Sequence, residues 1–309
     1  MPVSTGPTSV PTDYDVIIVG GGPAGLSAAL VLARSLRRVL ICDAGDQRNR
    51  LSHGLHGYLT RDGILPGEFL SLARAEVLRY GAEIRECTVM RTGMADRHFS
   101  VELIDGTQLS ARRLLLATGV VDRIPQVEGL RELYGKSVHH CPYCDGWEHR
   151  GAPIAVYGNG SGAMALALAL KNWSPQLILF TDGVSRLRSR ERYRLQRNEI
   201  PVIETKIRRL EGHDGRLLNV HLEDGNSVPR SALFFSTGHD QRSELAQRLG
   251  CPLSPKGAVR TSRAQGTPVQ GLYVAGDACH DVHYVVVAAA EGAKAAMAIH
   301  QELAREDLA

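Results

Sequence analysis

The most regular feature of the chain is an order of apolar and polar positions that occurs twice. In the first occurrence, an apolar run at 16–19 is followed by a Gly-rich turn at 20–25 and a helical pattern at 26–33, and a second apolar run at 39–42 ends at Asp43. Short apolar runs bounded by turn residues are typical of buried strands. The pattern therefore predicts a strand, a tight turn, a helix and a second strand that ends in an acid.

The second occurrence repeats these parts in the same order. An apolar run at 154–157 leads through a Gly-rich turn at 158–163 into a helical pattern at 164–172, and a strand pattern at 177–180 ends close to Asp182. Two such units are typical of the α/β class, so we predict two Rossmann-like dinucleotide-binding domains.

Both turns follow the G-x-G-x-x-G/A pattern, in which the backbone cradles a pyrophosphate. The first glycine makes the tight turn, the second lets the backbone approach the phosphates, and the third position packs the helix on the strand. The helix N-terminus adds free N–H groups, and the acid accepts hydrogen bonds from ribose hydroxyls. The predicted contacts are Gly20, Gly22, Gly25 and Asp43 for FAD, and Gly158, Gly160, Ala163 and Asp182 for NADP or NAD.

The second unit is predicted to be inserted in the first. Similar sequence motifs end the two units, at 114–119 and at 233–238. After the second motif, a strand pattern at 271–277 ends in Gly-Asp, and an Ala-rich helical pattern runs from about 285 to 304, broken only by Gly292. We therefore predict a discontinuous FAD-binding domain at 13–123 plus 242–309, an NAD(P)-binding-like domain at 124–241, and a disordered tail at 1–12.

Charge and hydropathy exclude several classes of partner. The chain has 36 basic and 33 acidic residues, and the Arg-rich stretch at 186–197 is predicted to be a solvated helix face, so we expect no nucleic-acid partner. No run of 18 apolar residues occurs, so we expect no membrane partner. The first twelve residues lack the apolar centre of a signal peptide, which favours a cytoplasmic location.

The cysteine pattern predicts redox chemistry. Of six cysteines, only Cys141 and Cys144 are close in sequence. A C-x-x-C pair at a helix start has a lowered thiol pKa, because the helix dipole favours the thiolate. Asp145 adjoins the second cysteine and can move protons, and His139 and His140 can lower a thiol pKa or accept its proton.

Three alternatives to a redox disulfide stay open on the residues alone. The first is a zinc site made from the two cysteines with His139, His140 or His149, although structural zinc normally needs a second ligand pair at a fixed distance. The second is a glutaredoxin-like domain, in which C-P-Y-C lies at the first strand–helix junction. The third is a buried structural disulfide. We favour the redox disulfide and predict no metal cofactor.

The order of these motifs resembles low-molecular-weight thioredoxin reductase over residues 13–305. The resemblance is carried by both Gly-rich turns, Ala117-Thr-Gly119, Cys141-x-x-Cys144-Asp-Gly146 and Val274-Ala-Gly-Asp277. It implies a homodimer, with Cys144 against the flavin, Cys141 exchanging with the substrate, and Asp145 as acid and base. It also implies that further FAD contacts come from Arg48, Asn49, His56, Val89, Thr118, Gly119, Gly276, Asp277, Tyr284 and Val285.

Two departures from that family bear on the substrate. Thioredoxin reductases usually have His-Arg-Arg after the second nucleotide strand, where this chain has Phe180-Thr-Asp182, and a carboxylate there suits a 2′-hydroxyl better than a 2′-phosphate. They also have Arg-Gln before the last helix, where His283-Tyr284 and an aliphatic run stand here. Together with the C-P-Y-C motif and His139-His140, these departures make the chain resemble a subgroup of this fold. That subgroup oxidises small-molecule dithiols in the gliotoxin, holomycin and romidepsin pathways.

The sequence therefore predicts an FAD-dependent dithiol/disulfide oxidoreductase. Our first hypothesis is oxidation of a small-molecule dithiol to an intramolecular disulfide, with electrons passing through FAD to O2 or NAD(P)+. The alternative is NAD(P)H-dependent reduction of a thioredoxin-like protein. A third hypothesis, of another class, is a flavin-bound redox sensor without turnover.

Overall fold

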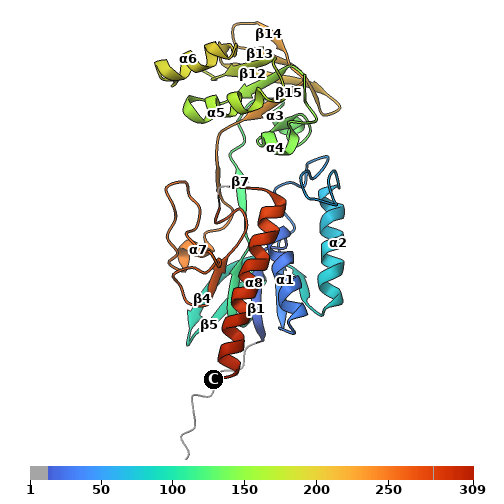
Figure 1. The fold of residues 1–309 in the computed structure, drawn as a ribbon, viewed down its shortest axis with the longest axis vertical. Helices are drawn as coiled ribbons and strands as arrows, with labels where there is room; N and C mark the ends of the chain where they lie inside the picture. Colours follow the sequence, from blue (N-terminus) through green and yellow to red (C-terminus); the bar gives the residue numbers. More distant parts are fainter. Residues whose placement is uncertain (1–12, 281) are drawn as a thin grey trace, which may run out of the picture. The chain divides into compact units, whose positions relative to one another are not determined.

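The computed structural model describes residues 13–280 and 282–309, and the chain forms two compact units (Figure 1). The first unit holds the described residues up to Gln47, Gly67–Val121 and Asp240–Ala309, whereas the second holds Arg48–Pro66 and Asp122–His239. The predicted fold class, with one Rossmann-like unit inserted in the other, is confirmed. The functional domain boundaries at 123/124 and 241/242 stay predictions, and the predicted tail, 1–12, lies outside the described residues.

The first unit is built on a mixed sheet with the strand order β3-β2-β1-β6-β5-β4, in which β17 also pairs with β6. β1, β2, β3, β6 and β17 pair in parallel, and β4, β5 and β6 pair antiparallel. The strands are β1 (Tyr14–Val19), β2 (Val39–Asp43), β3 (Glu83–Glu86), β4 (Val89–Ala95), β5 (His98–Leu103), β6 (Gln108–Leu116) and β17 (Leu272–Val274).

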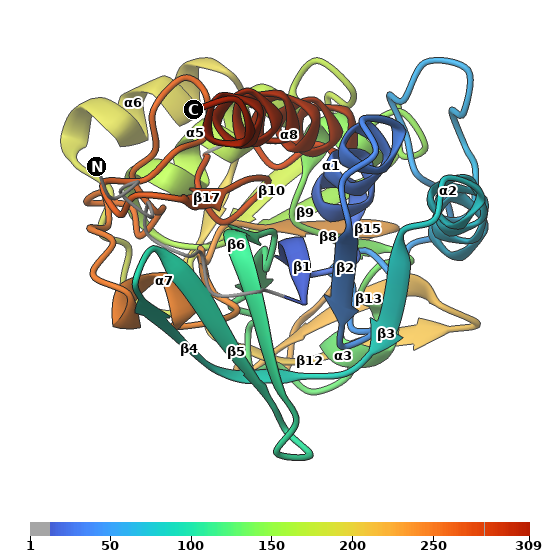
Figure 2. The ribbon, with the colours of Figure 1, turned by 90° about the horizontal axis from the view of Figure 1, so that it is seen from below.

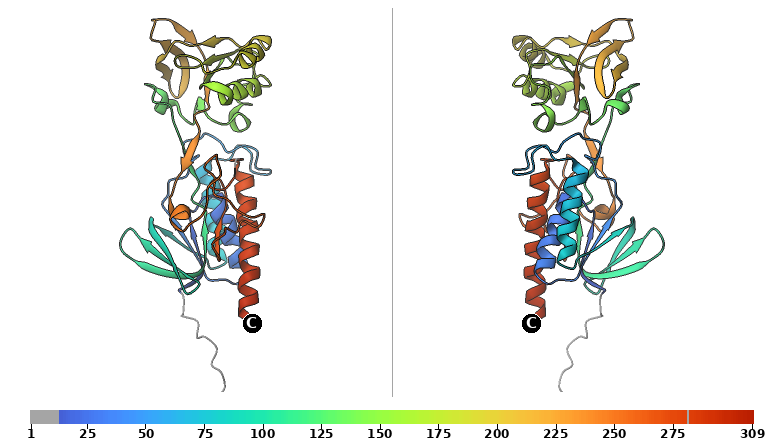
Figure 3. Two further views of the ribbon diagram at one scale, coloured as in Figure 1. Left: turned by 90° about the vertical axis from the view of Figure 1, so that its left-hand side faces the viewer. Right: turned by 90° about the vertical axis from the view of Figure 1, so that its right-hand side faces the viewer.

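Two helices pack against each other on one side of this sheet. Helix α1 (Pro23–Arg34) and helix α8 (Val285–Asp307) run side by side, and the β4–β5 hairpin lies on the other side of the unit (Figures 2 and 3). Gly292 does not break α8, contrary to the sequence pattern. A Cβ at Gly292 would stand 2.0 Å from the carbonyl oxygen of Ala24 in α1, so this glycine lets the helices approach closely. The unit also contains α2 (Pro66–Arg79) and α7 (Leu245–Arg248).

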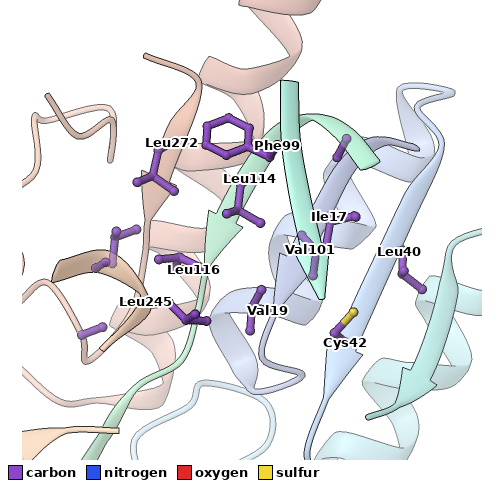
Figure 4. Close-up of a cluster of buried hydrophobic side chains, with 14 of the residues drawn as sticks. Ile17, Val19, Leu40, Cys42, Phe99, Val101, Leu114, Leu116, Leu245 and Leu272 are labelled. Atoms are coloured by element: carbon purple, nitrogen blue, oxygen red, sulfur yellow. The ribbon is translucent and has the colours of Figure 1, made fainter. Parts of the chain in front are cut away.

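Apolar side chains cover both faces of β1, as expected for a parallel strand in an α/β sheet. Val16 and Ile18 pack with the helices α1 and α8, whereas Ile17 and Val19 belong to the cluster on the opposite face. Figure 4 shows that second cluster, in which Phe99 of β5 packs with strands β1, β2, β6 and β17. This double packing holds the carboxyl ends of the strands, and the turns that follow them, in fixed places.

The second unit has a parallel sheet with the strand order β11-β10-β9-β15-β8 and an antiparallel sheet with the order β12-β13-β14. The chain passes between the units through β7 and β16, which pair with each other. The strands are β7 (Val120–Asp122), β8 (Val138–His139), β9 (Ile154–Tyr157), β10 (Leu177–Phe180), β11 (Val202–Ile203), β12 (Ile207–His213), β13 (Arg216–Leu222), β14 (Ser227–Pro229), β15 (Ala232–Phe235) and β16 (His239–Gln241).

Four helices are found among the described residues of this unit: α3 (Leu130–Leu133), α4 (Pro142–Asp145), α5 (Gly160–Leu170) and α6 (Ser189–Arg197). Helix α6 carries most of the Arg-rich stretch, and within it only Leu195 is buried. None of the helices in the described part of the chain is both long and apolar enough to cross a membrane.

Candidate active site

The cysteine pair lies at the junction between β8 and α4. Cys141 is the N-cap of α4, with Pro142 following it, and Cys141 and Cys144 form a disulfide with their Cα atoms 5.3 Å apart. The backbone N–H of Cys144 donates to the Sγ of Cys141 over 3.1 Å. Proline at the first helical position favours the helical turn, which keeps the two sulfurs within bonding reach. In this disulfide neither sulfur is a thiolate that could bind zinc.

His139, Asp145 and His149 form a chain of polar contacts beside the pair. The Nδ1 of His139 lies 3.2 Å from a carboxylate oxygen of Asp145, and its Nε2 lies 2.9 Å from the Nε2 of His149. Burial and the neighbouring His139 lower the pKa of His149 to about 4. The structure thus brings together the predicted residues His139 and Asp145 and adds His149.

His140 belongs to a second network. Its Nδ1 lies 3.2 Å from the hydroxyl of Tyr134, which donates to Asp122 over 2.9 Å, and Arg48 binds the same carboxylate through its Nε over 2.8 Å. Burial alone would raise the pKa of Asp122, but the Arg48 hydrogen bond and the charge of His140 lower it to about 2. Burial lowers the pKa of His140 to about 4 despite the nearby Asp122.

These two histidines should make the stability of the protein depend on pH. Because their pKa values fall from 6.5 to about 4 on folding, the unfolded chain binds more protons between these values, so acidification from pH 6.5 to 4 favours unfolding. We expect the double variant His140→Phe/His149→Phe to lose less stability than the wild type between pH 7 and pH 5, measured by urea unfolding. The exposed His213→Gln variant is the control. An equal loss in the double variant and the wild type would contradict the assignment.

The first Gly-rich turn fits the pyrophosphate of FAD. Gly20 has φ +112°, and a Cβ there would stand 2.3 Å from the carbonyl oxygen of Ala117. A Cβ at Gly25 would stand 1.9 Å from the carbonyl oxygen of Gly20, whereas at Gly22 it would meet nothing within 4 Å. Gly22 is the N-cap of α1 and no side chain caps that helix, so its N-terminus is open to an anion.

Asp43 is surrounded by donors from its own unit. Its buried carboxylate accepts from the backbone N–H of Gly45, from the amide of Gln47 and from the guanidinium of Arg74. Asp43 stands at the end of β2 as the motif requires. Its contact with ribose hydroxyls stays a prediction, and such a contact would share the carboxylate with Gln47 and Arg74.

The other predicted FAD contacts fall in both units. In the first unit, Val89 begins β4, Thr118 and Gly119 follow β6, Gly276 and Asp277 follow β17, and Tyr284 and Val285 begin α8. In the second unit, Arg48 pairs with Asp122, and His56 lies 3.6 Å from both Asp62 and Glu148. Asn49 lies next to Arg48, in the segment Arg48–Pro66 of that unit. The role of all these residues at FAD stays a prediction.

At the second Gly-rich turn, the Asn159 side chain forms hydrogen bonds with the residues that follow β10. The side-chain amide of Asn159, between Gly158 and Gly160, donates to the carbonyls of Thr181 and Val184 over 3.1 Å and accepts from the N–H of Arg186 over 2.7 Å. A Cβ at Gly160 would also meet the Cβ of Arg186 at 4.0 Å. The Asn159 side chain therefore holds the segment after β10 against this turn.

The carboxylate of Asp182 is also engaged inside the second unit. One oxygen accepts from the hydroxyl of Tyr157 over 2.8 Å, and the other accepts from the backbone N–H of Ile207 over 2.9 Å. Asp182 has φ +53°, in the left-handed region, which aspartate tolerates better than most residues. Ala163 is fully buried in α5, so its part in the turn is to pack the helix on the sheet.

Cys279, His280 and Glu291 form a cluster with metal-ligand spacing within the described residues. The Sγ of Cys279 lies 3.3–3.4 Å from the carbonyl oxygens of Gly276 and Val274, and burial raises the pKa of its thiol. A thiolate is disfavoured next to carbonyl oxygens, so this cysteine is held as a hydrogen-bond donor. Glu291, whose pKa is raised by burial, accepts from the N–H of Gly276 over 2.9 Å.

Several residues of these networks were missed by the sequence reasoning. His149 was noted only as a zinc ligand, and no local motif marks the others, because their partners are distant in the chain. A polar residue within an otherwise apolar helical pattern was the one usable signal, and it applies to Glu291 in α8. The missed residues are His149, Asp122, Tyr134, Arg74, Asn159 and Glu291.

Comparisons with known proteins agree with this geometry. The family model described as pyridine nucleotide-disulphide oxidoreductase matches residues 14–292. The chain is 31% identical to a probable thioredoxin reductase of Arthroderma benhamiae over 95% of this chain and 81% of that protein, and 32% identical to the thioredoxin reductase tcpT of Claviceps purpurea over 85% and 86%.

Solved structures are similar over nearly the whole chain. The crystal structure of HlmI has a TM-score of 0.92 at 39% identity, and the match covers 96% of this chain and 94% of the HlmI chain. A putative thioredoxin reductase TrxB from Bacillus anthracis has a TM-score of 0.90 at 33% identity, covering 95% of this chain and 99% of that one.

Proposed function

The chain belongs to the pyridine nucleotide-disulphide oxidoreductase family, and from this premise we propose that it oxidises a small-molecule dithiol to an intramolecular disulfide. It is an FAD-dependent thiol–disulfide oxidoreductase, as its family and relatives show. When bound, FAD supplies a two-electron acceptor that can return electrons to O2 or NAD(P)+. The proposed FAD contacts are the open first turn with Gly20, Gly22 and Gly25, together with the other residues predicted from the sequence.

The state of the second Gly-rich turn is the observation that carries this direction of electron flow. Asn159 ties residues 181–186 across the turn, and both oxygens of Asp182 accept bonds from within the unit. A nicotinamide dinucleotide that used Asp182 to bind its ribose would have to compete with the hydroxyl of Tyr157 and the N–H of Ile207 for this carboxylate. An enzyme that receives electrons from a dithiol and passes them to O2 does not need that second site.

The chemistry of exchange follows from the disulfide and its neighbours. A substrate thiol gives its proton to Asp145 and bonds to the Sγ of Cys141, while the Cys141–Cys144 bond breaks and Cys144 leaves as a thiolate. The second substrate thiol then attacks the mixed disulfide, and Cys141 leaves and takes up a proton. The substrate loses two S–H bonds, and its two protons are held by Asp145 and Cys141. The enzyme disulfide becomes the Cys144 thiolate and the Cys141 thiol, so the substrate is oxidised by two electrons.

Consumption of oxygen without a pyridine nucleotide tests this proposal. With dithiothreitol as the dithiol and no NADPH, we expect about one hydrogen peroxide for each dithiol oxidised, from the two-electron balance. NADPH-dependent reduction of a thioredoxin, with no peroxide formed from the dithiol, would overturn it. That result would establish the alternative, an NAD(P)H-dependent reductase of a thioredoxin-like protein, which the names of several relatives support.

Replacement of Asp182 by alanine tests the role of the second unit. The sequence alone predicts better use of NADPH relative to NADH, because a carboxylate near the 2′-phosphate is removed. The internal bonds of Asp182 predict a second effect, a loss of about 1–3 kcal/mol in stability, because the N–H of Ile207 and the hydroxyl of Tyr157 lose their acceptor. Urea unfolding and the ratio of NADPH to NADH oxidation measure the two effects. Unchanged stability would contradict the internal role.

We also propose that the enzyme is a cytoplasmic homodimer, as the sequence and its resemblance predict. Sedimentation of the holoenzyme at micromolar concentration measures the oligomeric state, and a monomer would contradict the proposal.

A further inference from the structure

The contact between His139 and His149 joins two ring nitrogens, each of which can donate or accept a hydrogen bond. Their rings face each other through Nε2 atoms 2.9 Å apart, and each neutral imidazole has one donor and one acceptor nitrogen. Only one hydrogen can lie between the two atoms. The tautomers of the two rings are therefore coupled, and a change at one ring requires a change at the other.

The rest of the unit holds this pair in place. Phe234, which is fully buried in β15, contacts both rings at centroid distances of 5.2 and 6.0 Å. His139 is buried at the end of β8, whereas His149, in the turn after α4, is partly exposed. His149 is therefore the more exposed of the two rings, and its Nδ1 is the nitrogen that does not face His139.

Two arrangements of the protons satisfy both contacts in the row Asp145–His139–His149. In the first, Asp145 is ionised and accepts from the Nδ1–H of His139, whose Nε2 accepts from the Nε2–H of His149. In the second, Asp145 is protonated and donates to Nδ1 of His139, whose Nε2–H donates to Nε2 of His149, and His149 carries its hydrogen on Nδ1. The second arrangement holds one more proton than the first.

We propose that His149 is the outlet of a proton relay that connects Asp145 to solvent, an inference that rests on the proposed exchange at Cys141 and Cys144. When Asp145 has taken a thiol proton, it passes one proton to Nδ1 of His139, the Nε2–H of His139 passes to Nε2 of His149, and the Nδ1–H of His149 is released to water. One proton enters at Asp145 and one leaves at His149. The same steps in reverse return a proton to a leaving thiolate.

Substitution by glutamine separates a relay from a structural role. In His149→Gln the amide can still hydrogen-bond to Nε2 of His139, but it cannot exchange a proton between two ring nitrogens. We expect the rate at which dithiothreitol reduces the Cys141–Cys144 disulfide at pH 7 to fall at least about ten-fold, toward the range typical of lost acid–base catalysis. The readout is quenching with an alkylating reagent followed by mass measurement, which does not depend on FAD.

Chemical rescue is the second measurement. In His149→Ala, added imidazole should restore the rate in proportion to its concentration, whereas in His149→Gln it should not. His213→Gln, which alters a histidine that is 81% exposed in the same unit, is the matched control and should match the wild type. A wild-type rate in His149→Gln, or no rescue of His149→Ala in a folded protein, would overturn the relay. Thiol exchange is common to oxidase and reductase, so these outcomes stand apart from the peroxide test.

Discussion

Replacement of Cys144 by serine is expected to abolish reduction of the flavin by a dithiol, and with it all turnover. The disulfide joins Cys141 and Cys144 at the start of α4, and a hydroxyl cannot replace a thiolate as leaving group in the exchange. By resemblance to the family, Cys144 is the sulfur next to the flavin. The thiolate–flavin absorbance band should therefore disappear in this variant, because its donor sulfur is gone.

The companion variant distinguishes the two sulfurs. Cys141→Ser should keep that band, because Cys144 stays free as a thiolate, but it should stop turnover, because the sulfur that exchanges with the substrate is missing. Cys87→Ser, which alters a partly buried free cysteine, should retain turnover and is the control. A band that survives in Cys144→Ser would mean that the two roles are reversed. Full turnover in either Cys141→Ser or Cys144→Ser would mean that exchange occurs elsewhere.

Replacement of Gly292 by alanine is expected to cause a large loss of stability in the first unit. The new Cβ would stand 2.0 Å from the carbonyl oxygen of Ala24, and backbone cannot move aside as a flexible side chain does. Forcing α1 and α8 apart should cost about 3 kcal/mol or more, the upper range for overpacking. Ala24 lies in the first turn of α1, beside the proposed phosphate site, so FAD retention should fall as well.

A second helical glycine provides the control for that variant. Gly67 lies in α2, and a Cβ there would meet nothing within 4 Å. Gly67→Ala should leave stability unchanged or raise it by up to about 1 kcal/mol, because alanine favours the helix. Urea unfolding of the two variants, together with the FAD content of each purified protein, measures the difference. Equal stability of the two variants would contradict the close approach of α1 and α8.

The sequence was sufficient for features that depend on local pattern. The doubled strand–turn–helix pattern predicted β1, α1 and β2, and again β9, α5 and β10, because burial and turn formation leave a direct signal in apolar runs and glycines. It did not predict the contact between Gly292 and Ala24. That glycine looked like a break in a helical pattern, because its partner lies far away in the chain.

In the candidate site, too, the local features could be predicted from the sequence and the long-range contacts could not. The C-x-x-C motif, with Asp145 and His139 beside it, is local, and the structure brings those residues together. The bonds of Asp182 could not be predicted, because Ile207 and Tyr157 reach it from other strands. His149 is close in sequence to the cysteines, but its contact with His139 depends on how the turn after α4 folds back on β8.

The most direct test of the account is the absorbance of the flavin under anaerobic conditions, with NADPH, NADH and dithiothreitol added in turn to separate samples of the holoenzyme. We predict that only the dithiol bleaches the oxidised flavin rapidly, and that the colour returns when air is admitted. Rapid bleaching by NADPH or NADH, with little effect of the dithiol, would contradict the proposed direction of electron flow and establish a working second nucleotide site.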